Sequence, residues 1–270
     1  MRSYDPHVRV ERDGHVVSVT LDHPAAKNAC TGDMWVALGA TFRDAAYSGA
    51  RAVLLTGAGG DFCAGADLTG GSGGGEGNGE GDGGRQATMM DAMRVLGDVV
   101  LAIHDCPVPV VSAVDGVCVG AGLGLALAAD LTWCSDTARF SAIFAKRGLS
   151  LDFGTSWLLR ERIGAHRAKE LAFTARVVSG TEAAELGLVN AAVPADDLAR
   201  AAREVVDAIA AGPPIALSIT KRELNGAASG SLAQALEAEA LGQSVNARTH
   251  DMREALTAYV ERRTPQFEGR

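Results

Sequence analysis

The spacing of apolar and polar residues predicts alternating strands and helices through the first half of the chain. Residues 15–22 (HVVSVTLD) alternate as a half-buried strand does, whereas 51–57 (RAVLLTG) and 108–114 (VPVVSAV) are continuous apolar runs of buried-strand length. Between these runs, residues 32–49 and 87–106 place apolar side chains at helical spacing. This alternation predicts an α/β core with right-handed crossovers.

The pattern changes from about Ala165, after which one helical segment follows another. The segment 231–245 (SLAQALEAEALGQSV) carries apolar residues on more than one face, which predicts burial between subunits as well as against the core. We therefore expect an α/β core over residues 1–195 and a helical C-terminal region over 196–270. The indicated helix starts are Thr181 as an N-cap, the run 194–197, Pro213-Pro214, Ser231 and the segment 251–263.

One segment, residues 70–84, is unlike the rest because ten of its fifteen residues are glycine and none is hydrophobic. Such a segment cannot repay the entropy of ordering, so it is expected to be a mobile loop. A phosphate-binding loop would need a strand leading into a helix with a Lys-Ser/Thr pair, and neither is present. Beyond it, Met89, Met90 and Met93 are candidate linings of a pocket, with core packing of an amphipathic helix as the alternative.

Composition and charge exclude several classes of function. A net charge of -8 argues against a nucleic-acid binder. No apolar signal core or membrane-length apolar run is found, so a cytoplasmic protein is expected. The five cysteines form no CxxC pair and are predicted to be reduced, buried thiols. The six histidines make no HxxxH or HExxH pattern, so no metal site is expected.

Two glycine-containing corners each follow a predicted buried strand. They are 57–68 (GAGGDFCAGADL) and 115–130 (DGVCVGAGLGLALAAD), and their small residues leave backbone N–H groups open to a ligand. The second leads into a helix, so its N–H groups also lie at a positive helix end. Ordinary tight turns are the alternative; a dinucleotide site is disfavoured because no acidic residue follows at the expected distance. If the two corners face each other, their backbone N–H groups would donate to one anionic oxygen.

These corners carry a resemblance to the enoyl-CoA hydratase/isomerase (crotonase) superfamily over nearly the full chain. The matching segments are 23–29 (HPAAKNA), 57–68, 107–130, 175–194 and 254–269. The resemblance implies a spiral of ββα turns, a helical C-terminal region that builds homotrimers or dimers of trimers, and an acyl-CoA thioester substrate. It implies no further cofactor, since coenzyme A is part of the substrate.

The resemblance also assigns roles to individual residues. Backbone N–H groups that hold the thioester oxygen fall on Ala66 and Ala121, where they would stabilise an enolate. The residues implied to contact coenzyme A are Ala25, Ala26, Lys27, Ala64, Asp67 and Leu68. For Lys27 a solvated surface lysine is the alternative.

The catalytic carboxylates depart from the hydratase pattern. The two glutamates of the hydratases would fall at Gly124 and Phe144, and neither is acidic. Asp152 instead matches the position of the catalytic carboxylate in the isomerases and the dehalogenase of the superfamily. Its apolar neighbours Leu151 and Phe153 would raise its pKa and make it a better base. The alternative is that Asp152 only caps the helix that follows.

The sequence therefore predicts an enzyme that moves a double bond within an enoyl-CoA. Asp152 would transfer the proton while the N–H groups of Ala66 and Ala121 hold the dienolate. A hydratase, or another enolate reaction that uses an acid not located, is an alternative within the family. A non-catalytic acyl-CoA binder is an alternative of another class, and it would bind acyl-CoA without turning over 2- or 3-enoyl substrates. The acyl chain cannot be read from these motifs.

Overall fold

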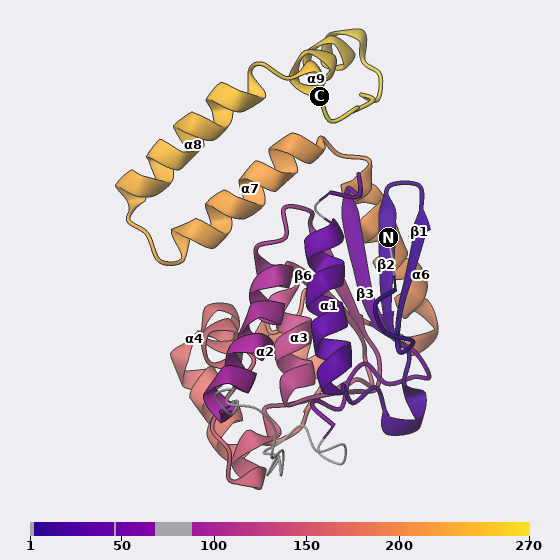
Figure 1. Cartoon of the computed structure of the whole chain (residues 1–270). Helices are drawn as coiled ribbons and strands as arrows, with labels where there is room; N and C mark the ends of the chain where they lie inside the picture. The colour runs from indigo at the N-terminus through magenta and orange to yellow at the C-terminus, as the bar shows by residue number, and fades with distance from the viewer. Residues whose placement is uncertain (1–2, 46, 68–87) are drawn as a thin grey trace, which may run out of the picture.

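The computed structural model describes residues 3–45, 47–67 and 88–270, which form two sheets surrounded by helices (Figure 1). The larger sheet is antiparallel between its first two strands and parallel through the rest. In spatial order its strands are β1 (Val8–Asp13), β2 (Val16–Leu21), β3 (Ala52–Gly57), β4 (Val110–Val114), β6 (Leu131–Ser135) and β9 (Ala191–Val193). The smaller sheet is β5 (Val117–Val119), β7 (Arg139–Ser141) and β8 (Val178–Ser179).

The helices follow the periodicity of the sequence. The described α-helices are α1 (Gly32–Ala45), α2 (Met89–His104), α3 (Ala121–Ala128), α4 (Thr155–Thr174), α5 (Gly180–Leu186), α6 (Leu198–Ala210), α7 (Pro214–Ala227), α8 (Leu232–Asn246) and α9 (His250–Glu261). Short 3₁₀ turns are η1 (Pro24–Ala26), η2 (Ile143–Arg147) and η3 (Ala195–Asp197). Helix α7 begins at the predicted Pro214, and Ser231 caps α8 with a capping box. The predicted α/β class is confirmed.

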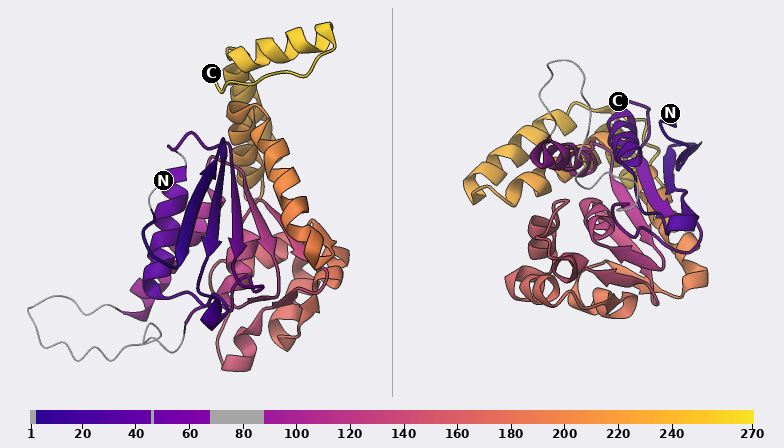
Figure 2. Two further views of the ribbon diagram at one scale, coloured as in Figure 1. Left: turned by 90° about the vertical axis from the view of Figure 1, so that its right-hand side faces the viewer. Right: turned by 60° about the horizontal axis from the view of Figure 1, so that its bottom comes forward.

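The larger sheet is covered on both faces, which explains the continuous apolar runs of its central strands (Figure 2). Along β3, Val53 and Leu55 face the main core beneath α1, α2 and α3. Ala52 instead belongs to a second cluster with Val206 of α6, on the opposite face. Every residue of α3 is buried, so this helix lies at the centre of the molecule.

Two details of the second half differ from the prediction. Thr181 is not the N-cap of α5; the hydroxyl of Ser179 accepts the N–H of Glu182 at 3.1 Å instead. Strands β8 and β9 lie within the region expected to hold helices only, because runs of two and three residues are too short to show a period. Helix α6 packs on the sheet although it follows residue 195, and the predicted domain boundary stays a prediction.

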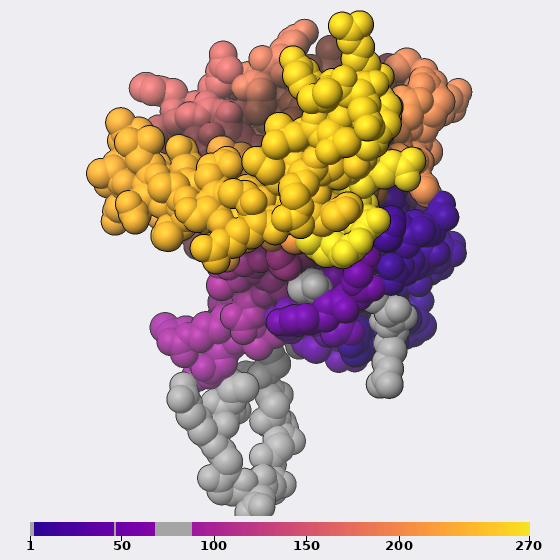
Figure 3. Space-filling view, turned by 90° about the horizontal axis from the view of Figure 1, so that it is seen from above, coloured from indigo at the N-terminus to yellow at the C-terminus, as the bar shows by residue number. Residues whose placement is uncertain are grey.

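The C-terminal helices project from this body. Helices α7 and α8 lie side by side, and Figure 3 shows α8 and α9 forming an arm that covers one face of the molecule. Many large apolar side chains of the arm are exposed: Leu232, Leu236, Leu241, Val245, Leu256, Tyr259 and Val260. None of the helices in the described ranges has the length and apolar character needed to cross a bilayer.

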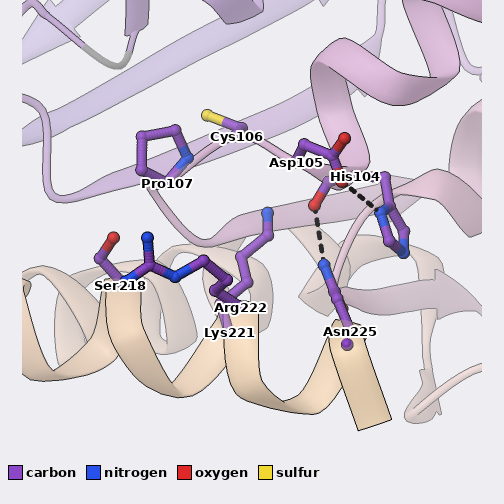
Figure 4. Close-up of a pocket in the computed structure, with 9 residues that line it drawn as sticks. His104, Asp105, Cys106, Pro107, Ser218, Lys221, Arg222 and Asn225 are labelled. Carbon is purple, nitrogen blue, oxygen red and sulfur yellow. Dashed lines mark hydrogen bonds and ion pairs between the residues drawn. The ribbon is translucent and has the colours of Figure 1, made fainter. Parts of the chain in front are cut away.

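A buried ion pair fastens α7 to the body. The Lys221 ammonium donates to the Asp130 carboxylate at 2.7 Å and to the carbonyl of Ile103 at 3.2 Å, while Asp130 also accepts the N–H of Val110. Burial raises the pKa of Asp130, whereas the nearby Lys221 cation lowers it, and the effect of burial is the larger of the two. Beside it, Asn225 donates to the carbonyl of His104 at the end of α2 (Figure 4).

Removing one partner of this pair is expected to destabilise the fold strongly. Lys221→Met leaves Asp130, whose side chain is 23% exposed, without its cation, which should lower the free energy of unfolding by about 1–3 kcal/mol. Urea unfolding followed by circular dichroism measures the loss. Arg200→Met is the control, because Arg200 makes exposed ion pairs on α6 and should change stability far less. Equal effects of the two substitutions would contradict this account.

Candidate functional site

Three neighbouring parallel strands deliver their following loops to one edge of the larger sheet. Strand β2 leads into residues 23–30, β3 into 58–67 and β4 into 115–121. Because the carboxyl ends of parallel strands lie at the same edge, these loops meet, as the sequence motifs require. The site is therefore built from segments that lie far apart in the sequence.

Asn28 fixes the first loop against the second. Its side-chain amide donates to the carbonyls of Ala58 at 2.8 Å and Asp61 at 2.6 Å, and its oxygen accepts the N–H of His23 at 2.8 Å. The residue is fully buried and has a left-handed backbone (φ 56°), a conformation that asparagine tolerates. The motif HPAAKNA contains this residue, but nothing in the sequence signals that its side chain joins two loops.

The backbone around Ala66 presents an N–H group without an internal partner. Cys30 pairs with Ala66 in a parallel bridge: the Cys30 N–H donates to Gly65 O at 2.8 Å, and the Asp67 N–H donates to Cys30 O at 2.9 Å. In such a bridge the N–H of the middle residue points away from the partner strand. None of the described residues accepts a hydrogen bond from Ala66 N–H, so it is open to a ligand.

The second open N–H group lies at the start of α3. Gly120 is the N-cap, with φ 59° and its own N–H bonded to Ser141 O at 3.1 Å. Ala121 is the first helical residue, so its N–H has no acceptor within the helix. Ala121 is 4% exposed, which places this N–H group in a largely dry environment at the positive end of the helix dipole.

The two corners lie against each other. A second parallel bridge joins Cys63 to Cys118, with Cys63 N–H donating to Val117 O at 2.8 Å and Val119 N–H donating to Cys63 O at 3.1 Å. A Cβ atom built on Gly65 would lie 3.5 Å from the backbone nitrogen of Ala121. The loop that carries Ala66 therefore lies directly against the start of α3, where Ala121 begins the helix.

The residues expected at the coenzyme also gather here. Ala25 and Ala26 form η1, and Lys27 follows with a left-handed backbone; its carbonyl accepts the Ala64 N–H at 3.0 Å. The Lys27 ammonium is exposed and 4.0 Å from the Asp61 carboxylate, so it can reach a phosphate in solvent. Leu68 lies outside the described residues, as does the glycine-rich segment 70–84.

Neither of the two positions at which the resemblance implies hydratase glutamates holds a carboxylate, and one of them has no room for a side chain. A Cβ atom on Gly124 would lie 2.4 Å from the carbonyl oxygen of Phe153 and 3.0 Å from the Phe153 Cβ. Any side chain at 124 would therefore force the backbone apart. Phe144 is 5% exposed and packs within the main core.

Asp152 directly precedes a residue that packs against the first turn of α3. The next residue, Phe153, packs on Gly124, which shares a helix face with Ala121. The Oδ1 atom of Asp152 is buried, and no described residue donates a hydrogen bond to it. Burial raises the pKa of this carboxyl above its usual 3.8. The alternative role was wrong: the N-cap of α4 is Gly154, without a side-chain cap.

The methionines of α2 are not core residues. Met89, Met90 and Met93 are 55%, 62% and 39% exposed, so the core-packing alternative is wrong for all three. All five cysteines are free and buried, as predicted. Within the described ranges, no group of three or more His, Cys, Asp or Glu side chains could hold a metal ion.

Comparisons with known proteins agree with the resemblance found in the sequence. Residues 11–270 match the family model described as enoyl-CoA hydratase/isomerase. A protein of Rhodobacter capsulatus named probable enoyl-CoA hydratase is 35% identical, over 97% of this chain and 98% of its own. The 1,2-epoxyphenylacetyl-CoA isomerase of Escherichia coli is 32% identical, over 94% and 95%. An enoyl-CoA hydratase structure from Bacillus anthracis superposes with a TM-score of 0.90 at 29% identity, over 98% and 100%, and confirms the predicted fold.

The contact between the corners should not tolerate a side chain at Gly122. A Cβ atom there would lie 2.3 Å from the carbonyl oxygen of Cys63, a backbone atom that cannot rotate away. Gly122→Ala is expected to lower the free energy of unfolding by about 1–3 kcal/mol in urea titrations, as overpacking does. Gly97→Ala on α2 is the control, since its Cβ atom meets nothing within 4 Å. A stable Gly122→Ala protein would show that the corners are not in close contact.

Proposed function

Because the chain belongs to the enoyl-CoA hydratase/isomerase family, we propose that it moves a double bond within an enoyl-CoA thioester. The observation that carries this proposal is Asp152, a partly buried carboxylate with an unpartnered oxygen, directly before a residue that packs on α3. The two positions from which a hydratase would act on water hold Gly124 and Phe144. A single carboxylate is enough for proton transfer between two carbons of one substrate.

In the proposed reaction, Asp152 removes a proton from a carbon activated by the thioester and its double bond. The resulting dienolate carries its negative charge on the thioester oxygen, between the N–H groups of Ala66 and Ala121. Each such donor typically lowers the barrier by about 2.7–4 kcal/mol. Protonated Asp152 then returns the proton to the other end of the dienolate. The raised pKa of Asp152 suits both steps. The carboxylate is a stronger base in the first step, and the protonated carboxyl is the acid in the second, so no second acid is needed.

Coenzyme A is proposed to lie along the loops at 23–30 and 64–67, with the Lys27 ammonium near one of its phosphates. No separate cofactor is required, because the thioester itself stabilises the carbanion. A hydratase is the second candidate, favoured by the name of the Rhodobacter capsulatus relative. It would require an acid other than one at 124 or 144.

Asp152→Asn is the direct test of the base. The substitution keeps the size of the side chain and leaves the cap at Gly154 untouched, so stability should change little. We expect the rate of conversion of 3-enoyl-CoA to 2-enoyl-CoA to fall by about 10²–10⁴-fold, the usual contribution of a positioned base. Asp196→Asn, on the exposed turn η3, is the control. Isomerisation by Asp152→Asn at the wild-type rate would refute the assignment.

The same enzyme preparation distinguishes the alternatives. Hydration of 2-enoyl-CoA without isomerisation would support a hydratase, and thioester binding without turnover would support a non-catalytic binder. The isomerisation rate should fall as pH is lowered, because the base must be ionised. The raised pKa of Asp152 places the midpoint of that fall above 3.8, and Asp152→Asn should abolish it.

Assembly is the last part of the proposal. The exposed apolar residues of α8 and α9 are proposed to be buried between subunits of a homotrimer or a dimer of trimers. Light scattering at micromolar concentration should give three or six times the chain mass of 27.8 kDa. Leu236→Glu together with Val260→Glu should lower that mass, because charges would be placed in an apolar interface. A wild-type monomer would refute this part.

A further inference from the structure

Phe153, the residue after Asp152, has a backbone conformation that an aromatic residue rarely adopts. Its φ is 50°, in the left-handed region that suits glycine, and Gly154 follows with φ 71°. Of the described non-glycine residues with positive φ, Phe153 is the only aromatic one. A bulky residue pays free energy to stay in this region, so the surrounding structure must hold it there.

Two helices contact Phe153. The ring of Trp35, on α1, lies with its centroid 4.6 Å from that of the Phe153 ring at an interplanar angle of 45°. On α3, the absence of a side chain at Gly124 lets the Phe153 carbonyl and Cβ approach the helix. Phe153 is 4% exposed and Trp35 is 2% exposed, so both rings are fixed in the packed interior.

The Asp152 carboxylate has no comparable support of its own. No described residue donates a hydrogen bond to either of its oxygens, and its main-chain carbonyl is its contact with α4, accepting the Thr155 N–H at 2.9 Å. The direction of the Asp152 side chain is therefore set by the backbone of the turn that begins at Asp152. The packing of Phe153 against its neighbours fixes that turn.

We propose that Phe153, held between Trp35 and the first turn of α3, is a positioning residue that directs the Asp152 carboxylate at the reacting carbons. This inference rests on the proposed function, since it gives Asp152 its role as base. Trp35 contributes by packing: its indole N–H is buried and has no hydrogen-bond partner among the described residues. Neither aromatic residue touches the substrate in this account.

The test uses matched substitutions on one helix. Trp35→Leu removes the ring that holds Phe153, whereas Phe42→Leu removes an equally buried ring farther along α1. Trp35→Leu should lower kcat for isomerisation by about tenfold or more with KM nearly unchanged, because small displacements of a catalytic group are costly. Phe42→Leu should leave kcat within about twofold at a similar loss of stability. Trp35→Phe keeps an aromatic ring and should restore most of the rate.

A second variant covers the case in which Trp35→Leu does not fold. Phe153→Leu keeps most of the buried apolar volume but loses the ring contact with Trp35, so it should fold and still lose kcat. Equal kcat for Phe153→Leu and the wild-type enzyme would overturn the proposal.

A double-substitution cycle separates positioning from a general loss of structure. If Trp35 acts through Asp152, Trp35→Leu should cause no further loss of rate in an enzyme that already carries Asp152→Asn. The same fold loss in both backgrounds would overturn the positioning role. Activity of Asp152→Asn at the wild-type rate would instead overturn the proposed function. Loss with Asp152→Asn but no difference between Trp35→Leu and Phe42→Leu would overturn the positioning role alone.

Discussion

The close approach of two backbone segments, at Cys63 and at the start of α3, is the constraint on which the site depends. The bridge between Cys63 and Cys118 and the missing side chain at Gly122 bring these segments to main-chain contact distance. This contact is what the proposed pairing of the Ala66 and Ala121 N–H groups on one oxygen requires. Main-chain donors fixed in this way need no reorganisation when charge develops on a bound oxygen. The low aromatic content and the many glycines of the chain suit backbone segments that must approach each other closely.

The sheet explains why the segments meet. Strands β2, β3 and β4 are adjacent and parallel, so the loops that follow them emerge together although about ninety residues separate the first from the last. Asn28 then joins the first loop to the second through two hydrogen bonds and braces its own loop through a third. A buried side chain that satisfies its own polar atoms and three backbone groups makes the loops one rigid unit. The precision of the site is therefore a property of the sheet edge and not of any single loop.

Two kinds of feature could be predicted from the sequence. They are the strands and helices with a clear hydrophobic period, and the glycine-containing turns with backbone N–H groups available to a ligand. Periodicity located β2, β3 and β4 and most helices, and the glycine corners located the open N–H groups. The short strands β5, β8 and β9 could not be predicted, because two or three residues carry no period. Caps were uncertain for a related reason: Ser179 and Thr181 both suit an N-cap, and the tertiary position of the turn decides between them. The contact of Trp35 with Phe153 joins residues more than a hundred positions apart, so no local sequence pattern could predict it.

The packing of Phe153 on Gly124 connects the two unusual features of the catalytic region. A glutamate at 124, as in the hydratases that the chain resembles, would collide with the Phe153 carbonyl. The turn that carries Asp152 can therefore lie where it does only if position 124 has no side chain. The absence of one carboxylate and the placement of the other are then consequences of a single contact. A side chain at 124 and the present position of this turn therefore exclude each other, so a protein with an acid at 124 would need this turn to lie farther from α3.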